Sequence, residues 1–258
     1  MKESLKGLEE IVREAGARLL QNQQAQVHEK EGIGNYVTEQ DLSTQRFLYE
    51  RIGELLPEAR FMGEEDETHD PAGEGLTVII DPIDGTANFI RGAKYSAISV
   101  GVVREGKLLM GVVYNPWTDE LYRAAAGEGA FLNDRPIRVS DRPLDQGVAV
   151  VGFTAYERDL TDRQFRLFRN LFDGCQDLRS LGSAALDICG VACGRWETFT
   201  ELRLLPWDYA GAWCILQEAG GILTNVEGED PGFAGATSIL AASALCHEAA
   251  LSCCQQSK

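Results

Sequence analysis

The chain has 258 residues, of which 44% are hydrophobic and 25% charged, the composition of an ordinary globular protein. Its 24 Lys and Arg residues against 40 Asp and Glu residues give a formal net charge of −16. A surface of this charge repels phosphate backbones and anionic lipids, so we expect no nucleic-acid partner and no membrane partner. An anionic small molecule would have to be held by local cations or backbone N–H groups.

The N-terminal segment MKESLKGLEEIVREAG lacks the apolar stretch of a secretion signal. Apolar residues at steps of three and four instead predict an amphipathic helix, with Leu5, Leu8, Val12, Ala15 and Leu19 on its buried face. No run reaches the roughly 18 apolar residues of a membrane span. The seven cysteines are odd in number and confined to the C-terminal third, which makes a poor disulfide framework. We therefore expect a cytoplasmic protein.

A second helix is predicted to start near Asp41, a good N-cap residue, and to stop before Pro57. Residues 63–75 predict an acidic loop, and residues 76–80 a buried strand that ends at Asp81–Pro82. This mixture of helix pairs and strand runs favours α+β layers over strict βαβ alternation. The remaining predicted elements are strands over 95–103, 107–114, 148–151, 196–201 and 222–226, and helices over 183–193 and 208–219.

The segment Asp81–Pro82–Ile83–Asp84–Gly85–Thr86 places two carboxylates at the end of the buried strand. Gly85 permits a tight turn, and Thr86 could open a helix whose first N–H groups favour a phosphate. Oxygen ligands of this kind suit Mg²⁺. A capped turn with solvated aspartates is the alternative interpretation of such a segment by itself.

Two further acidic residues strengthen the metal interpretation. Glu64 precedes the strand by little more than ten residues, so it could lie beside Asp81. Asp208 follows Trp207 at the start of a helix that Gly220–Gly221 ends. Each would be ordinary alone, as a loop residue or a helix cap, but GEE…DPIDGTANF…WD…EAGG in this order is a far more specific pattern.

In these motifs the sequence resembles the inositol monophosphatase family over nearly its whole length. The resemblance implies an α+β fold, a layered αβαβα sandwich, which is often homodimeric. It implies a single phosphatase domain over 1–258, with an N-terminal α+β half of about 1–145 and a C-terminal α/β half of about 146–258. It also implies two or three Mg²⁺ ions and sensitivity to lithium.

The same resemblance assigns the metal ligands. Glu64, Asp81 and the carbonyl of Ile83 match the ligands of one ion. Asp81, Asp84 and Asp208 match those of a second ion, with Asp81 bridging. Glu64 with water would hold a third ion. Four carboxylates cannot crowd together without compensation, so the ions would turn an acidic hole into a phosphate site.

Other positions match catalytic and substrate residues of the family. Thr86 matches the threonine that orients the attacking water, and Asp41 the aspartate that hydrogen-bonds to that threonine. Asp41 could equally be a plain helix cap, and both roles can hold together. Glu201 matches an acid that contacts a substrate hydroxyl. The predicted substrate contacts are completed by Gly85, Thr86, Gly182, Ser183 and Ala184.

These matches predict a Mg²⁺-dependent phosphate monoester hydrolase for a small polyol or sugar phosphate, with inositol monophosphate as the first hypothesis. Fructose-1,6-bisphosphatase, histidinol phosphatase and 3′-phosphonucleotide phosphatase activities remain alternatives. A regulatory binding protein on the same fold is the alternative from another class. Ala87 in GTANF and the segment Gly152–Phe153–Thr154 depart from the expected pocket, and Arg203 could reach a second phosphate. The substrate therefore stays open.

Overall fold

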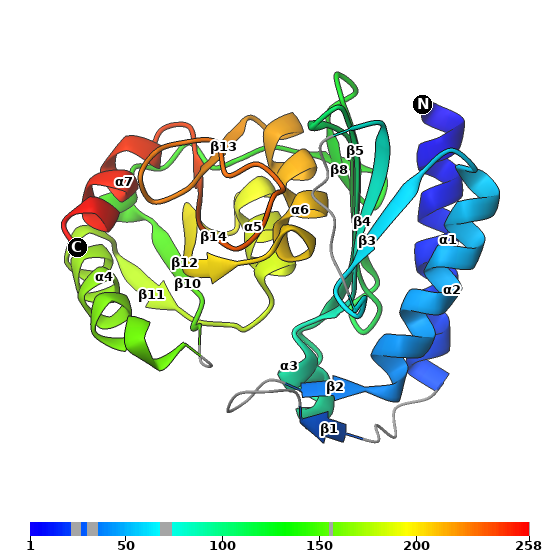
Figure 1. Cartoon of the computed structure of the whole chain (residues 1–258). Helices are drawn as coiled ribbons and strands as arrows, with labels where there is room; N and C mark the ends of the chain where they lie inside the picture. The colour runs from blue at the N-terminus through cyan, green and yellow to red at the C-terminus, as the bar shows by residue number, and fades with distance from the viewer. Residues whose placement is uncertain (22–26, 30–35, 68–73, 155–156, 258) are drawn as a thin grey trace.

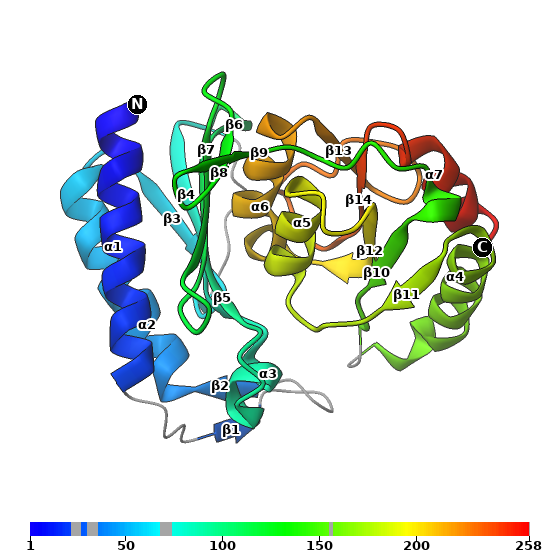
Figure 2. The same cartoon turned by 180° about the vertical axis from the view of Figure 1, so that it is seen from behind.

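The computed structural model describes residues 1–21, 27–29, 36–67, 74–154 and 157–257. Its helices and sheets stack in five layers, αβαβα, which confirms the predicted fold class (Figure 1). The two outer helical layers are α1 and α2 on one side and α4 and α7 on the other, and α5 and α6 lie between the sheets (Figures 1 and 2). The helix bounds are Lys2–Gln21 (α1), Glu39–Leu55 (α2), Thr86–Arg91 (α3), Thr161–Gly174 (α4), Ala184–Ala192 (α5), Pro206–Glu218 (α6) and His247–Gln255 (α7).

The first sheet has seven strands in chain order. Its first two strands are parallel, and every later neighbour is antiparallel. The bounds are Arg60–Gly63 (β3), Leu76–Asp84 (β4), Ala97–Arg104 (β5), Lys107–Asn115 (β6), Glu120–Ala125 (β7), Ala130–Leu132 (β8) and Arg135–Ile137 (β9). A separate short pair joins Val27–Glu29 (β1) to Tyr36–Thr38 (β2).

The second sheet has five strands in the order β11-β10-β12-β14-β13. β10 is parallel to both of its neighbours, whereas β14 is antiparallel to both of its own. The bounds are Val148–Val151 (β10), Asp177–Arg179 (β11), Thr198–Leu204 (β12), Gly221–Thr224 (β13) and Thr237–Ser243 (β14). We propose that residues 1–145 and 146–258, each of which contains one of the sheets, are the two halves of a single domain.

The middle helical layer packs very closely against the seven-stranded sheet. Every residue of α5 is buried, as expected for a helix enclosed on all sides. The backbone of α6 approaches β6 so closely that a Cβ on Gly111 would overlap the carbonyl oxygen of Gly211. Glycines on β6 and α6 thus allow α6 to lie close to the seven-stranded sheet, with Asp208 in its first turn.

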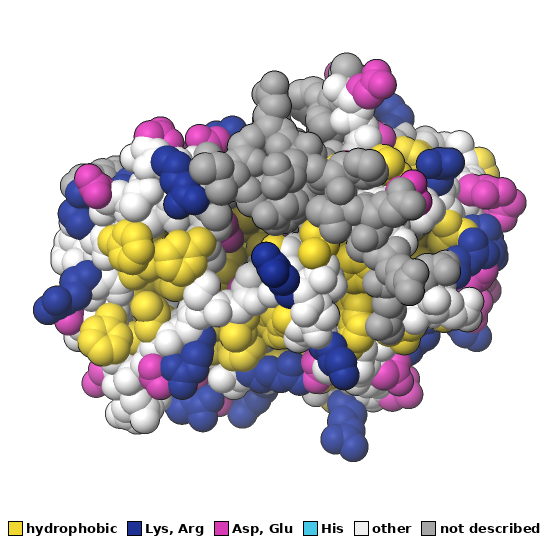
Figure 3. Space-filling model, turned by 90° about the horizontal axis from the view of Figure 1, so that it is seen from below, with side chains coloured by type: hydrophobic (Ala, Val, Ile, Leu, Met, Phe, Trp, Pro, Cys, Tyr) yellow, Lys and Arg dark blue, Asp and Glu magenta, His cyan; other side chains and the backbone are white. Residues whose placement is uncertain are grey.

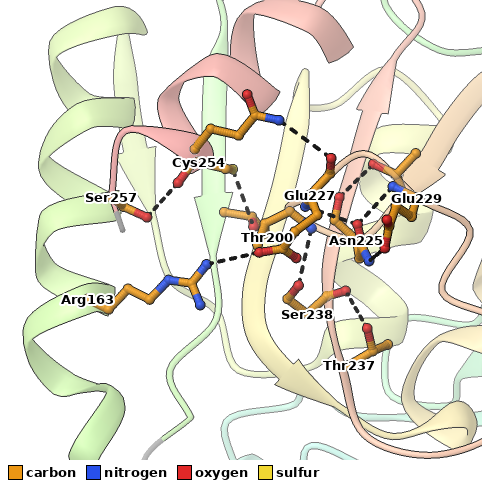
Figure 4. A network of polar contacts seen from close by, with 12 residues as sticks. Arg163, Thr200, Asn225, Glu227, Glu229, Thr237, Ser238, Cys254 and Ser257 are labelled. Carbon is orange, nitrogen blue, oxygen red and sulfur yellow. Dashed lines mark hydrogen bonds and ion pairs between the residues drawn. The ribbon is translucent and has the colours of Figure 1, made fainter.

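A network of polar contacts fixes the outer helices to the five-stranded sheet (Figure 4). Arg163 of α4 donates to Glu227 at 3.4 Å, and Thr200 of β12 lies 4.0 Å from the sulfur of Cys254 in α7. Ser257 donates to the carbonyl of Cys254 at 2.6 Å. Contacts from α4 and α7 therefore support the five-stranded sheet, which carries Glu201.

Several predicted boundaries differ from the structure. The second helix begins at Glu39, because Thr38 is its N-cap and Asp41 is the third helical residue. β4 does not end at Asp81–Pro82 as predicted but continues to Asp84. The stripe Leu5, Leu8, Val12, Ala15 and Leu19 of α1 is buried as predicted. Among the described residues, no helix combines the length and apolar character that crossing a membrane requires.

Candidate active site

A cavity of about 200 Å³ opens between the two sheets, and residues from both halves line it. The seven-stranded sheet and its loops contribute Glu64, Asp81, Ile83, Asp84, Gly85 and Thr86. The C-terminal half contributes Gly152, Phe153, Gly182, Ser183, Ala184, Asp187, Glu201, Leu204 and Asp208. Every predicted site residue except Asp41 is in this lining. A larger cavity of about 930 Å³ adjoins α1 and α2, but Glu39 is the only carboxylate among its described lining residues.

An irregularity in β4 points two carboxylates into the cavity. In a regular strand, residues three apart face opposite sides of the sheet. The pairing of β4 with β5 shifts between Asp81, which is opposite Ser99, and Asp84, which is opposite Ala97. Pro82 lies inside this shift and has no N–H to donate to a ladder. The bulge therefore lets β4 continue to Asp84, and it turns the Asp84 side chain toward the same cavity as Asp81.

Gly85 turns the chain from β4 into α3. Its φ of 87° is in the left-handed region, and a Cβ there would lie 2.9 Å from the carbonyl oxygen of Gly182. Only glycine meets both conditions without strain. The turn places the Thr86 hydroxyl 3.0 Å from the carbonyl oxygen of Ile83, to which it donates.

Asp41 is buried behind Thr86 and does not line the cavity. One of its oxygens accepts from the N–H of Thr38 at 2.7 Å and from the Thr38 hydroxyl at 2.5 Å. The N–H of Asp41 donates in turn to the Thr38 hydroxyl oxygen at 3.4 Å, which completes a capping box. Its other oxygen lies 3.4 Å from the Thr86 hydroxyl. Burial raises the pKa of Asp41 to about 7, against the hydrogen bonds from Thr38. The predicted contact of Asp41 with Thr86 is present, but Asp41 is the third residue of the helix and not its N-cap, which is Thr38.

The other two predicted ligands come from different elements. Glu64 follows β3 directly, and its N–H donates to the carbonyl of Ile80 in β4 at 3.1 Å. Asp208 is the third residue of α6, and it accepts from the N–H of Leu205 at 2.7 Å. The parallel pairing of β3 with β4 and the close packing of α6 bring both residues to the cavity.

The buried carboxylates repel one another. Burial raises the pKa of Asp81 well above its usual value, and Glu64, Asp84 and Asp208 raise it further. Burial likewise raises the pKa of Asp208, opposed by the Leu205 N–H. The described residues of the cavity lining include no Lys or Arg. The negative charge therefore has no cationic partner in that lining.

The chemistry of these donors fits Mg²⁺, which prefers carboxylate and carbonyl oxygens. Among the described residues, however, no group of three His, Cys, Asp or Glu side chains is arranged to hold an ion. Asp84 accepts from the Ser183 hydroxyl and from the N–H groups of Ala184 and Ala185, at 3.2 and 2.8 Å. A bound cation would have to compete with these donors for the same oxygens.

The opposite wall of the cavity carries Glu201, on β12. Burial and, to a smaller extent, the charge of Asp84 together raise its pKa to about 8. The Thr154 hydroxyl lies 3.5 Å from one Glu201 oxygen. Gly182 is left-handed, with a φ of 86°, and Ser183 caps α5 through the N–H of Leu186 at 3.4 Å. Ser183 and its neighbours thus connect α5 to Asp84 across the interface of the two halves.

Asp187 is a lining residue that the sequence analysis missed. It lies one turn after Ser183 on α5 and is buried, and one oxygen accepts from the Tyr95 hydroxyl at 2.8 Å. Its other oxygen has no hydrogen-bond partner among the described atoms. The i, i+4 spacing from Ser183 was the signal that could have placed it on the cavity face.

The sequence offers two candidate cations for the site, Arg203 and Lys30, the latter at a position that matches a lysine near the site in the family resemblance. Arg203 pairs with Glu157, with Nε and Oε1 2.9 Å apart, and is absent from the described lining residues. Lys30, which the resemblance placed near the site, is outside the described residues. The structure therefore gives no support to a second phosphate held by Arg203.

The sequence model of the inositol monophosphatase family matches residues 1–258. The inositol-1-monophosphatase of Bacillus subtilis is 35% identical over 244 residues, which cover 92% of this chain and 91% of that protein. The Nus factor SuhB of Pasteurella multocida is 36% identical over 195 residues, which cover 75% and 73%. The solved structure of the Thermotoga maritima IMPase superposes with a TM-score of 0.88 at 30% identity, over 100% of this chain and 98% of that one.

Proposed function

Because this chain belongs to the inositol monophosphatase family, we propose that it is a Mg²⁺-dependent hydrolase of small polyol or sugar phosphate monoesters, with inositol monophosphate as the first candidate substrate. The observation that carries the proposal is the set of four carboxylates (Glu64, Asp81, Asp84 and Asp208) around one small cavity. Burial raises the pKa of Asp81, and the charges of Asp84 and Asp208 raise it further; metal ions would offset this repulsion.

We assign the residues as follows. Glu64, Asp81 and the carbonyl of Ile83 would hold one ion, and Asp81, Asp84 and Asp208 a second, with Glu64 also available to a third. Bound Mg²⁺ would lower the pKa of a water nucleophile and neutralise the charge on the phosphoryl oxygens. Residues of the chain would position the water, the phosphate and the alcohol.

Thr86 would position the water, and Asp41 would position Thr86. The Thr86 hydroxyl donates to the carbonyl of Ile83 at 3.0 Å and lies 3.4 Å from Asp41. When this hydroxyl donates to Asp41, its oxygen can accept a hydrogen bond from the water. Gly85 and Thr86 would contact the phosphate, while Ser183, its two neighbours and Glu201 would contact the alcohol. Phosphoryl transfer depends mainly on such positioning and charge neutralisation, so no covalent phosphoenzyme is required.

The names of relatives support the substrate class. The Bacillus subtilis relative is an inositol-1-monophosphatase, and it spans nearly the whole chain. The name of the Pasteurella multocida relative, a Nus factor, favours a second candidate, a regulatory binding protein on the same fold. All predicted catalytic residues are present in this chain, and a purely binding protein would not need them. Homodimer formation, lithium sensitivity and a cytoplasmic location belong to the same proposal.

A panel of phosphate esters tests the proposal. Purified protein with Mg²⁺ would be assayed for phosphate release from inositol, fructose, histidinol and nucleoside phosphates. We expect hydrolysis that is greatest for an uncharged polyol phosphate. Absence of phosphate release from every ester would reject the enzyme and favour the binding protein.

A further inference from the structure

A short segment after β10, Gly152–Thr154, forms part of the cavity wall opposite the predicted metal ligands. Gly152 and Phe153 both line the cavity. The proposed function uses Glu201 on this wall but gives no role to the phenyl ring beside it. The arrangement of this segment suggests what the wall recognises.

Gly152 brings the Phe153 segment and Glu201 together. Its N–H donates to the carbonyl of Thr200 at 3.0 Å, and a Cβ at this position would overlap the Glu201 carboxylate. Thr154 is anchored to α4, because its N–H donates to the side chain of Gln164 at 3.1 Å. The backbone on both sides of Phe153 is therefore held by hydrogen bonds, and Phe153 lines the same cavity as the Glu201 carboxyl group.

The Phe153 ring rests on two rings of α4. Its centroid lies 4.9 Å from that of Phe168 and 6.0 Å from that of Phe165, both in edge-to-face geometry. Phe168 is buried, but Phe153 is 47% exposed and Phe165 59% exposed. Figure 3 shows hydrophobic side chains gathered on the α4 side of this face. Uncovered aromatic surface next to a cavity is typical of a ligand-contact surface.

The charge of the cavity restricts what can lie on this surface. Glu201 and Asp187 are on the same side as Phe153, and the described lining offers no Lys or Arg. A second negative charge on the alcohol part of a substrate would thus find no partner among the described lining residues. An uncharged group with a flat apolar face would cover the ring instead.

We propose that Phe153, supported by Phe165 and Phe168, favours phosphate monoesters whose alcohol presents the apolar face of an uncharged ring close to the phosphate. This inference rests on the proposed phosphatase activity and extends it. Phe153 acts here as a specificity-determining residue, with Glu201 beside it available for a hydroxyl of the same alcohol.

The test compares esters that differ only in the ring. With Mg²⁺ present, kcat/KM would be measured for 2-phenylethyl phosphate and for ethyl phosphate, two primary alkyl esters of closely similar reactivity. We expect the wild type to favour the phenyl ester. Phe153→Ala should reduce the ratio of the two kcat/KM values by about tenfold, because the ring contact is lost. Phe153→Leu, which retains bulk without the aromatic face, should lower the ratio by a smaller factor.

Phe172→Ala is the matched control. Phe172 is on α4, as Phe165 and Phe168 are, and it is 56% exposed. It is not among the described lining residues of the cavity, so its replacement should leave the ratio unchanged. An unchanged ratio in Phe153→Ala, with both esters still hydrolysed, would overturn the inference and leave the proposed function standing. A fall of equal size in Phe172→Ala would also overturn it. If the wild type hydrolysed neither ester nor any polyol phosphate with Mg²⁺, the proposed function would fail and this inference with it.

Discussion

The two walls of the cavity differ in chemistry and in origin. The wall at the end of the seven-stranded sheet carries Asp81 and Asp84 from one continuous strand, with no flexible segment between them. Asp208, at the start of α6, belongs to this first wall although it comes from the C-terminal half. The second wall collects Phe153, Ser183 and Glu201 from three separate elements of that half. We infer that the first wall handles the phosphate and the second the alcohol. A compact strand suits chemistry that must stay fixed, whereas dispersed positions can change one at a time to suit different alcohols.

Removing divalent cations should have the largest effect on phosphate release, because every proposed metal ligand lies in the first wall. We expect excess EDTA to abolish phosphate release and added Mg²⁺ to restore it. Ca²⁺ should not replace Mg²⁺, since it is larger and takes more ligands at longer distances. Full turnover in EDTA would show that the carboxylate wall does not act through a metal.

Asp84→Asn should lower turnover by about 10²-fold or more while the fold stays intact. An asparagine whose amide oxygen takes the place of Oδ2 can still accept from the Ser183 hydroxyl and the Ala185 N–H, so only the 3.2 Å contact with the Ala184 N–H is lost. Without metal, loss of one negative charge should leave the melting temperature equal or slightly higher. Asp119→Asn, which removes an exposed partner of Arg13, is the control for a charge change outside the cavity. Near wild-type turnover in Asp84→Asn would make Asp84 a structural residue only.

The first wall was largely predictable from sequence, and the second was not. The contiguous DPIDG segment placed Asp81 and Asp84 together, while the order of the motifs and the family resemblance added Glu64 and Asp208. The bulge at Pro82 was missed, because a proline at a strand end and one inside an irregular strand have the same local signal. Asp187 and the rings of Phe153, Phe165 and Phe168 meet only through packing between β10, α4 and α5, which no local pattern specifies. The α4 helix itself was not predicted.

Replacing Glu201 should have a smaller effect, confined to the second wall. Glu201→Gln should lower kcat/KM for a polyol phosphate, relative to that for an alkyl phosphate without hydroxyls, by about tenfold. The assay belongs near pH 9, above the pKa of about 8, where the group is ionised before metal is added. Equal losses on both substrates would mean that Glu201 supports the catalytic centre or the fold.

The smallest expected effect is on the stability of the metal-free protein. Burial raises the pKa of Asp41 to about 7 and that of Glu201 to about 8, from ordinary values of 3.8 and 4.5. Between these limits the folded state holds protons that the unfolded chain has released, so the free energy of unfolding falls as pH rises from about 5 to about 8. The melting temperature in EDTA should drop by several degrees over this range. A flat or rising melting temperature would contradict these raised pKa values.

The most direct test of the central claim is a crystal structure of the protein with Mn²⁺ in place of Mg²⁺, with the ions located by anomalous scattering. We predict at least two peaks in the cavity, both within about 2.2 Å of Asp81 oxygens, with Glu64 on one and Asp84 and Asp208 on the other. Phe153 and Glu201 should contact neither ion. Mn²⁺ bound elsewhere, or an Asp81 carboxylate that contacts no ion in a crystal saturated with Mn²⁺, would contradict the division of the cavity into a metal wall and an alcohol wall.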